Sequence, residues 1–160
     1  MILPQFYIDD LIKNALLEDI NYIDVATDYL LDENQESEAV FVAKAEGILC
    51  GVDVAMRVFS LLDDSFTYTL YKKDGDLVRN GDLIAEFKGK TVKLLKGERT
   101  SLNLIQHMSG IATLTNECVK ETVGTKATIA DTRKTLPGLR SIQKYAVTCG
   151  GGRNHRYNLS

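Results

Sequence analysis

The stretch KATIADTRKTLPGLRSIQKYAVTCGGGRNHR, residues 126–156, determines the fold class that we predict. Residues 126–130 are short and mostly apolar, which favours a strand, and the residues 131–136 that follow are mainly polar. Pro137 suits the first turn of a helix, and Gly150 can close that helix. Its inward positions would be Leu139, Ile142, Ala146 and Cys149. A strand, a polar loop and a helix in this order are typical of an α/β unit, whose sites lie at the carboxyl end of the strand.

Upstream of this unit, hydrophobic periodicity predicts further helices and strands. Helices are predicted over residues 5–17, 51–62 and 97–123. Strands are predicted over residues 38–49, 66–71 and 91–95, with two short strands opened by Gly-Asp turns at 75–76 and 81–82. The acidic residues 19–34 are predicted to form a loop. We place a boundary near residues 88–92, which gives one domain over 1–90 and the start of another over 91–160, with part of helix 91–123 packing on the first.

The composition is that of a folded chain with a strong polarity of charge. Hydrophobic residues make up 44% and charged residues 26% of the 160 positions, which excludes disordered, collagen-like and disulfide-scaffold proteins. The formal net charge is −3, yet residues 1–40 hold ten acids and one base, whereas residues 120–160 hold eight bases and two acids. These bases are dispersed among Thr, Gly, Asn and His, which favours a site for a small anion over a nucleic-acid or membrane surface.

The cysteine pattern predicts reduced thiols. Cys50, Cys118 and Cys149 are odd in number and far apart, and they form no Cys-x-x-Cys or Cys/His ligand spacing. The spacing therefore supports neither a disulfide framework nor a zinc site. The chain has no signal-peptide pattern at Met1 and no run of 18 apolar residues, so we expect a cytoplasmic protein without a membrane span.

The first group of candidate site residues is Glu98-Arg99-Thr100-Ser101-Leu102-Asn103. With a helix predicted from residue 97, Arg99 would lie in its first turn, where a cation opposes the helix dipole and needs a partner. That partner could be an acidic side chain or a bound anion. His107 follows on the same stripe and is interpreted as a hydrogen-bonded structural residue.

The second group, Asp131-Thr132-Arg133-Lys134-Thr135, lies between the predicted strand and helix. An arginine binds a carboxylate bidentately, a lysine supplies a point charge, and the N–H groups of a helix start also attract anions. The alternative is a solvated loop that happens to carry two bases.

The third group, Gly150-Gly151-Gly152-Arg153-Asn154-His155-Arg156, combines glycines that allow close backbone approach with cationic and polar donors. It matches neither a dinucleotide-binding nor a P-loop pattern, and a flexible linker is the alternative. Together the three groups predict a site for a ligand with at least two negative charges; the residues by themselves indicate no further chemistry.

These groups resemble quinolinate phosphoribosyltransferases. The matching stretches, in order, are GERTSLN (97–103), MSGIAT (108–113), DTRKTLPGLR (131–140), KYAV (144–147) and GGGRNHR (150–156). The resemblance implies an α/β fold, with an N-terminal α/β sandwich-like domain followed by the first part of an open α/β barrel, and assembly as a homodimer.

The resemblance also implies a reaction and its residues. Quinolinate would react with phosphoribosyl pyrophosphate (PRPP) to give nicotinate mononucleotide, CO2 and pyrophosphate in NAD biosynthesis. Carried over by motif, the quinolinate site would comprise Arg99 from the partner subunit, Thr132, Arg133, Lys134, His155 and Arg156, with Lys134 also catalytic. Mg²⁺ would be bound through PRPP or by acidic residues beyond this chain. No residue of this chain itself is expected to be a metal ligand.

We expect the chain to stop within the barrel at Ser160, and therefore to lack turnover when alone. Two other classes of protein remain as alternatives. A non-enzymatic carrier is one, because residues 74–87 resemble the hairpins of biotinyl and lipoyl domains, although no lysine stands in the usual modifiable setting. A nucleic-acid-binding module using the basic end is the other.

Overall fold

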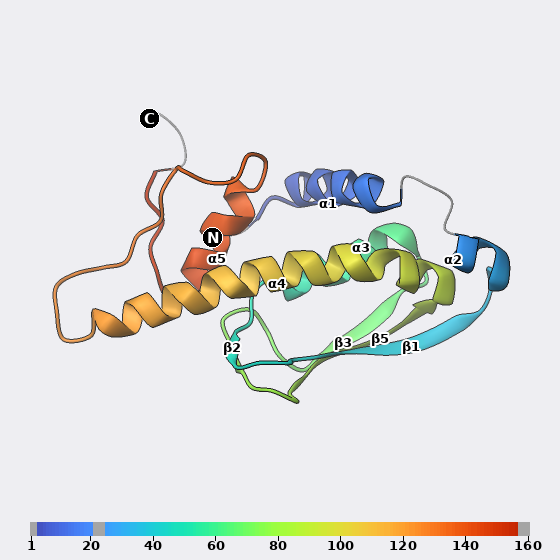
Figure 1. Ribbon diagram of the computed structural model, residues 1–160, viewed down its shortest axis with the longest axis horizontal. Coiled ribbons are helices and arrows are strands. Elements are labelled where there is room, and N and C mark those ends of the chain that lie inside the picture. The colour runs from blue at the N-terminus through green and yellow to red at the C-terminus, as the bar shows by residue number, and fades with distance from the viewer. Residues whose placement is uncertain (1–2, 21–24, 157–160) are drawn as a thin grey trace.

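The computed structural model describes residues 3–20 and 25–156, in which helices cover one face of a small antiparallel sheet (Figure 1). The helices are α1 (Gln5–Asp19), α2 (Val25–Leu30), α3 (Val52–Leu62), α4 (Thr91–Glu121) and α5 (Arg140–Cys149). The strands are β1 (Glu36–Val42), β2 (Gly47–Ile48), β3 (Thr67–Leu70), β4 (Leu77–Val78) and β5 (Leu83–Lys90). No helix in these residues is long and apolar enough to cross a membrane.

The strands form one sheet in the order β1-β5-β3 and a second pair, β2-β4, all antiparallel. The two predicted Gly-Asp turns are confirmed, because Gly75 and Gly81 both have φ of 93°, a backbone conformation that favours glycine. In each turn the aspartate closes the loop: Asp76 accepts a hydrogen bond from the Lys73 N–H (2.9 Å) and Asp82 from the Arg79 N–H (3.1 Å).

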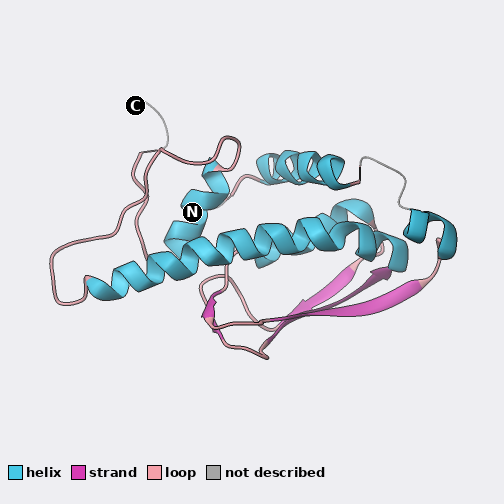
Figure 2. Cartoon of the chain, in the orientation of Figure 1, coloured by secondary structure: helices cyan, strands magenta, loops and turns pink. Residues whose placement is uncertain are grey.

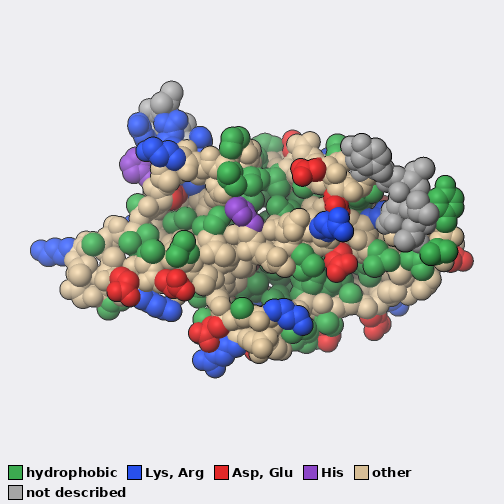
Figure 3. Space-filling view, in the orientation of Figure 1, with side chains coloured by type: hydrophobic (Ala, Val, Ile, Leu, Met, Phe, Trp, Pro, Cys, Tyr) green, Lys and Arg blue, Asp and Glu red, His purple; other side chains and the backbone are tan. Residues whose placement is uncertain are grey.

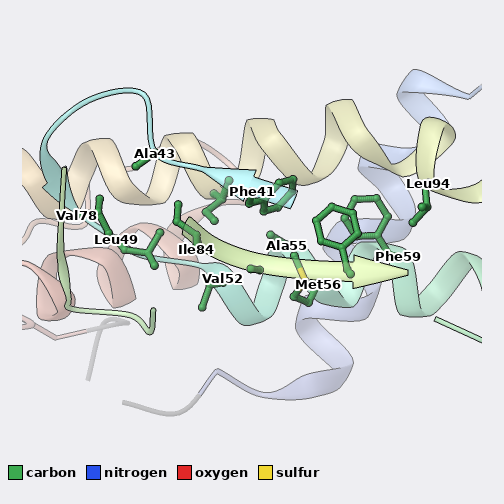
Figure 4. Packing of buried hydrophobic residues seen from close by; sticks show 13 residues of the cluster. Phe41, Ala43, Leu49, Val52, Ala55, Met56, Phe59, Val78, Ile84 and Leu94 are labelled. Carbon is green, nitrogen blue, oxygen red and sulfur yellow. The ribbon is translucent and has the colours of Figure 1, made fainter. Parts of the chain in front are cut away.

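Phenylalanine rings form the centre of the N-terminal core (Figure 4). Phe59 of α3 stacks on Phe87 of β5, with ring centroids 5.0 Å apart, and Phe41 of β1 meets Phe87 edge-on at 5.0 Å. Helix α4 approaches this core closely because Gly97 faces Phe59; a Cβ atom at Gly97 would lie 2.8 Å from the Phe59 ring. Aromatic packing and one glycine therefore join α3, α4 and the sheet.

A second apolar cluster joins the helices. Its fully buried members are Cys50, just before α3, and six residues of α1, α3, α4 and α5, namely Ile12, Val58, Met108, Ala112, Ile142 and Ala146. Figure 1 shows α4 running along the molecule, with the sheet on one side of it and α5 crossing near its C-terminal half. The end of the described chain is thus held on the same scaffold as its beginning.

Three predicted elements in the first 95 residues are wrong in part. Residues 91–95 begin α4 instead of forming a strand, and Leu94 packs in the N-terminal core from this helix. The predicted loop 19–34 contains α2, and Asp28 of α2 is paired with Lys96 of α4; residues 21–24 lie outside the described residues. Predicted strand 38–49 divides into β1 and β2.

The last prediction concerns the C-terminal unit. Residues 126–129 form no strand, and within the described part of the chain the only β-type pairing of residues 126–130 is a parallel bridge between Ala130 and Arg153. The helix begins at Arg140, after a turn that contains Pro137. Figure 2 shows that the chain between α4 and α5 is drawn as loop throughout.

Candidate anion-binding site

Two extended segments on either side of α5 lie next to each other and run parallel. The Asp131 N–H donates to the Arg153 carbonyl (3.0 Å), and the Arg153 N–H donates to the Ile129 carbonyl (2.9 Å). The carboxyl ends of parallel segments meet at one edge. The second predicted group, residues 131–135, and the end of the third, residues 154–156, therefore leave the two paired segments at the same edge.

A buried ion pair holds this edge together. The Lys144 ammonium of α5 lies 2.5 Å from the Asp131 carboxylate, and the two side chains are 0% and 4% exposed. The same carboxylate oxygen accepts the His155 backbone N–H (2.8 Å). Asp131 thus connects α5, the end of the first segment and the end of the second.

Side chains of α5 and α4 fix the loop that carries the bases. Arg140 Nε donates to Thr135 Oγ1 (3.2 Å), and Gln143 Oε1 accepts the Leu136 N–H (3.2 Å). The other end of the Gln143 amide is hydrogen-bonded to the His107 imidazole of α4 (3.1 Å). His107 is therefore a structural residue, as predicted.

The loop presents its predicted site residues in different ways. The Thr132 hydroxyl accepts the Lys134 backbone N–H (3.2 Å). The Lys134 side chain is exposed. Arg133 is half-buried, and its Nε is buried without a hydrogen-bond acceptor among the described residues. A buried, unpaired guanidinium nitrogen is unfavourable unless a ligand supplies the acceptor.

His155 and Arg156 complete the edge as exposed side chains. Within residues 132–156 there are six bases and no acid, and the carboxylate of the preceding Asp131 is already bound to Lys144. Figure 3 shows Lys, Arg and His side chains gathered near the C-terminal end of the chain. This edge can bind an anion with several negative charges through bidentate and point-charge contacts.

The structure does not bring Arg99 to this edge of the same chain. Arg99 Nη1 lies 3.1 Å from Asp19 at the end of α1, whereas the loop is contacted by Tyr7 at the start of α1, whose hydroxyl donates to the Gly138 carbonyl (2.5 Å). Asp19 lies twelve residues after Tyr7 on α1, or about 18 Å along the helix axis. The helix-dipole argument for Arg99 is wrong, since α4 begins at Thr91 and places Arg99 beyond the first turn.

Sequence reasoning missed Asp131 and Lys144 as a pair. Asp131 is the single acid in a segment of bases, and Lys144 stands between the inward positions Ile142 and Ala146 of α5. A lysine on the apolar face of a helix that has one nearby acid is the signal that could have revealed the pair.

The described residues do not fit a Mg²⁺ site at this edge. Magnesium prefers several oxygen ligands, and here the Asp131 carboxylate is occupied by Lys144 and by the His155 N–H.

Fold and site together define an α/β protein with a cluster of basic side chains beside two parallel chain segments. Comparisons with known proteins make this assignment specific. The family model for the N-terminal domain of quinolinate phosphoribosyl transferase matches residues 24–109, and the model for its C-terminal domain matches residues 111–160. The chain belongs to the quinolinate phosphoribosyltransferase family.

Curated relatives and solved structures agree with this assignment. The chain is 48% identical to a probable nicotinate-nucleotide pyrophosphorylase (carboxylating) of Bacillus subtilis over 93% of its length and 51% of the relative. It is 44% identical to the Mycobacterium leprae enzyme of that name, over 94% of the chain and 54% of the relative. A crystal structure of NadC from Streptococcus pyogenes superposes with a TM-score of 0.93 at 43% identity, covering 100% of this chain and 57% of that one. The chain spans about half the length of these relatives, and its predicted α/β class and resemblance are confirmed.

Proposed function

We propose that the protein containing this chain transfers the phosphoribosyl group of PRPP to quinolinate and decarboxylates the product to nicotinate mononucleotide. Pyrophosphate and CO2 are the other products, and the pathway served is NAD biosynthesis. The observation that carries the proposal is the acid-free edge formed by residues 132–134 and 155–156, on a chain of this family.

The proposed ligand matches the charge and geometry of this edge. Quinolinate is a dianion with adjacent carboxylates, so it needs several donors at short distances. Arg133 can offer its unpaired Nε together with a second guanidinium nitrogen to one carboxylate. Lys134, His155 and Arg156 are exposed beside it and can bind the other carboxylate, with the Thr132 hydroxyl as a further polar group.

These contacts orient the pyridine nitrogen for attack on the ribose carbon that carries pyrophosphate. As the C–O bond breaks, negative charge grows on the leaving group, and the Lys134 ammonium is the mobile cation available to stabilise it. The new C–N bond leaves the pyridine nitrogen positive. That charge stabilises the ring carbanion formed when CO2 departs, which a proton then quenches. We propose that Mg²⁺ enters with PRPP or is held by residues outside this chain.

Calorimetric titration of quinolinate into the complete protein tests the proposal. Arg133→Ala should weaken binding at least tenfold, since a charge-assisted hydrogen bond contributes about 1.5–3 kcal/mol. Arg79→Ala is the matched control, because Arg79 is exposed in the N-terminal half and pairs only at 3.6 Å with Glu46. Equal affinity of the wild type and Arg133→Ala would refute the assigned role.

We further propose that the protein is a homodimer in which Arg99 serves the partner's site. In favour of this, the Arg99 side chain is 75% exposed and lies remote from its own chain's basic edge. Mixing Arg99→Ala with Arg133→Ala subunits tests it, because a heterodimer then contains one intact site. Activity recovering to about a quarter of wild type supports sharing. No recovery, with heterodimers verified by mass, contradicts it.

A further inference from the structure

A thiol and carboxylate cluster lies where three distant chain segments meet. Its members are Cys50 before α3, Asp74 in the turn after β3, and Cys149 at the end of α5. One ligand atom from each, two sulfurs and a carboxylate oxygen, lie within 4.8 Å of one another. Sequence spacing could not reveal this group, because no two of its residues are near in the chain.

The cluster is held rigidly from several sides. The Cys50 backbone is fixed on α4, since its N–H donates to Ser109 Oγ (2.9 Å) and its carbonyl accepts from the same hydroxyl (3.1 Å). One oxygen of Asp74 accepts the N–H groups of Gly51 (2.8 Å) and Val52 (2.9 Å) at the start of α3. The other oxygen accepts the Tyr145 hydroxyl (2.9 Å).

The environment also suits a cation. Cys50 is fully buried and Cys149 is half-buried, so the two sulfurs are largely shielded from solvent. Asp74 and Tyr145 line a hollow of about 550 Å³ that is also bordered by Asp53. The hollow therefore reaches the cluster on the side of Asp74.

We infer that Cys50, Cys149 and Asp74 form a binding site for a thiophilic divalent cation of the Zn²⁺ class. Two sulfurs and one oxygen favour such an ion over Mg²⁺, which prefers oxygen ligands. Zinc binds sulfur at about 2.3 Å and carboxylate oxygen at about 2.0–2.2 Å, so the three groups need to close by about 1 Å. Tyr145 would orient the carboxylate from outside the ligand set. The ion would link the end of α5 to the N-terminal half of the chain. The link would lie next to the glycine run that leads to residues 153–156.

Co²⁺ titration of the reduced complete protein tests the site through optical spectra, independently of transferase activity. We expect one equivalent of tetrahedral Co²⁺ with a thiolate charge-transfer band, displaced by Zn²⁺ and not by excess Mg²⁺. Cys50→Ser and Cys149→Ser should each abolish that band. Tyr145→Phe should weaken binding about 10–100-fold.

Cys118→Ser is the matched control, because Cys118 is an exposed cysteine outside the cluster. It should leave the spectrum unchanged, and thermal melting should show that all variants are folded. A missing charge-transfer band in the wild type would overturn the inference. So would a band that survives in both Cys50→Ser and Cys149→Ser, or a Cys50–Cys149 disulfide that persists under reducing conditions.

Discussion

The N-terminal half and the segment after α4 are held in place by different forces. From β1 to α4 the contacts are chiefly apolar, with Phe41, Phe59, Phe66 and Phe87 packed together. From residue 122 to 156, outside α5, order comes from polar contacts made by Lys144, Arg140 and Gln143. The first arrangement supplies stability, and the second positions charged groups. Each should therefore be disrupted by different substitutions.

Removal of a central aromatic ring gives the largest expected loss of stability. Phe59→Ala deletes a ring that contacts Phe87 and Phe66 at centroid distances of 5.0 and 5.3 Å. We expect the free energy of unfolding to fall by about 3–5 kcal/mol, measured by urea denaturation. Quinolinate affinity should stay at the wild-type value wherever the variant is folded.

The matched control for this prediction is Phe6→Ala. Phe6 is 74% exposed on α1, so its removal should change stability by less than about 0.5 kcal/mol. If both variants unfold alike, the aromatic cluster does not have the role assigned to it.

A smaller and pH-dependent effect is expected at Asp63, a buried acid that joins α3 to the start of α4. Its carboxylate accepts the Lys90 N–H (2.7 Å), the Ser65 N–H (2.9 Å) and the Ser65 hydroxyl (2.6 Å). Burial alone would raise its pKa, but these hydrogen bonds outweigh burial and lower the pKa below its usual value. Asp63→Asn should destabilise the protein by about 1–3 kcal/mol at neutral pH.

The sign of the pH dependence follows from the lowered pKa. The carboxylate contributes its full stability above the unfolded pKa of about 3.9 and loses it as the pH falls through the folded pKa. The stability gap between wild type and Asp63→Asn should therefore narrow below about pH 4. Asp64→Asn, an exposed neighbour, serves as control, and a gap that is constant with pH would contradict the assignment.

The sequence predicts the apolar N-terminal half better than the segment after α4, where polar contacts between distant residues determine the structure. The periodic apolar residues of α1 and α3 and the Gly-Asp turns at Gly75 and Gly81 carry local signals, and these elements were predicted nearly in place. Residues 91–95 have strand-like composition but are helical, because tertiary context, including the packing of Leu94 in the N-terminal core, outweighs local preference.

The site was predictable as motifs and not as geometry. Arg133, Lys134, His155 and Arg156 stand in recognisable stretches, and the structure brings the two stretches to one edge. The contact between Lys144 and Asp131 forms only because α5 packs against the segment that ends at Asp131, and no local sequence pattern encodes that packing. The same is true of Cys50 and Cys149, which meet only through the tertiary fold.

The buried ion pair of Lys144 and Asp131 holds the two segments of the basic edge together. Hydrogen exchange at the Asp131, Arg153 and His155 amides tests this role most directly. Lys144→Met leaves the buried Asp131 carboxylate without its counter-charge, at a cost of about 3–5 kcal/mol. We predict that these three amides exchange at least tenfold faster in Lys144→Met, that adding Asp131→Asn restores part of the protection, and that β5 amides are unchanged. Unaltered exchange at all three amides in folded Lys144→Met would contradict the account.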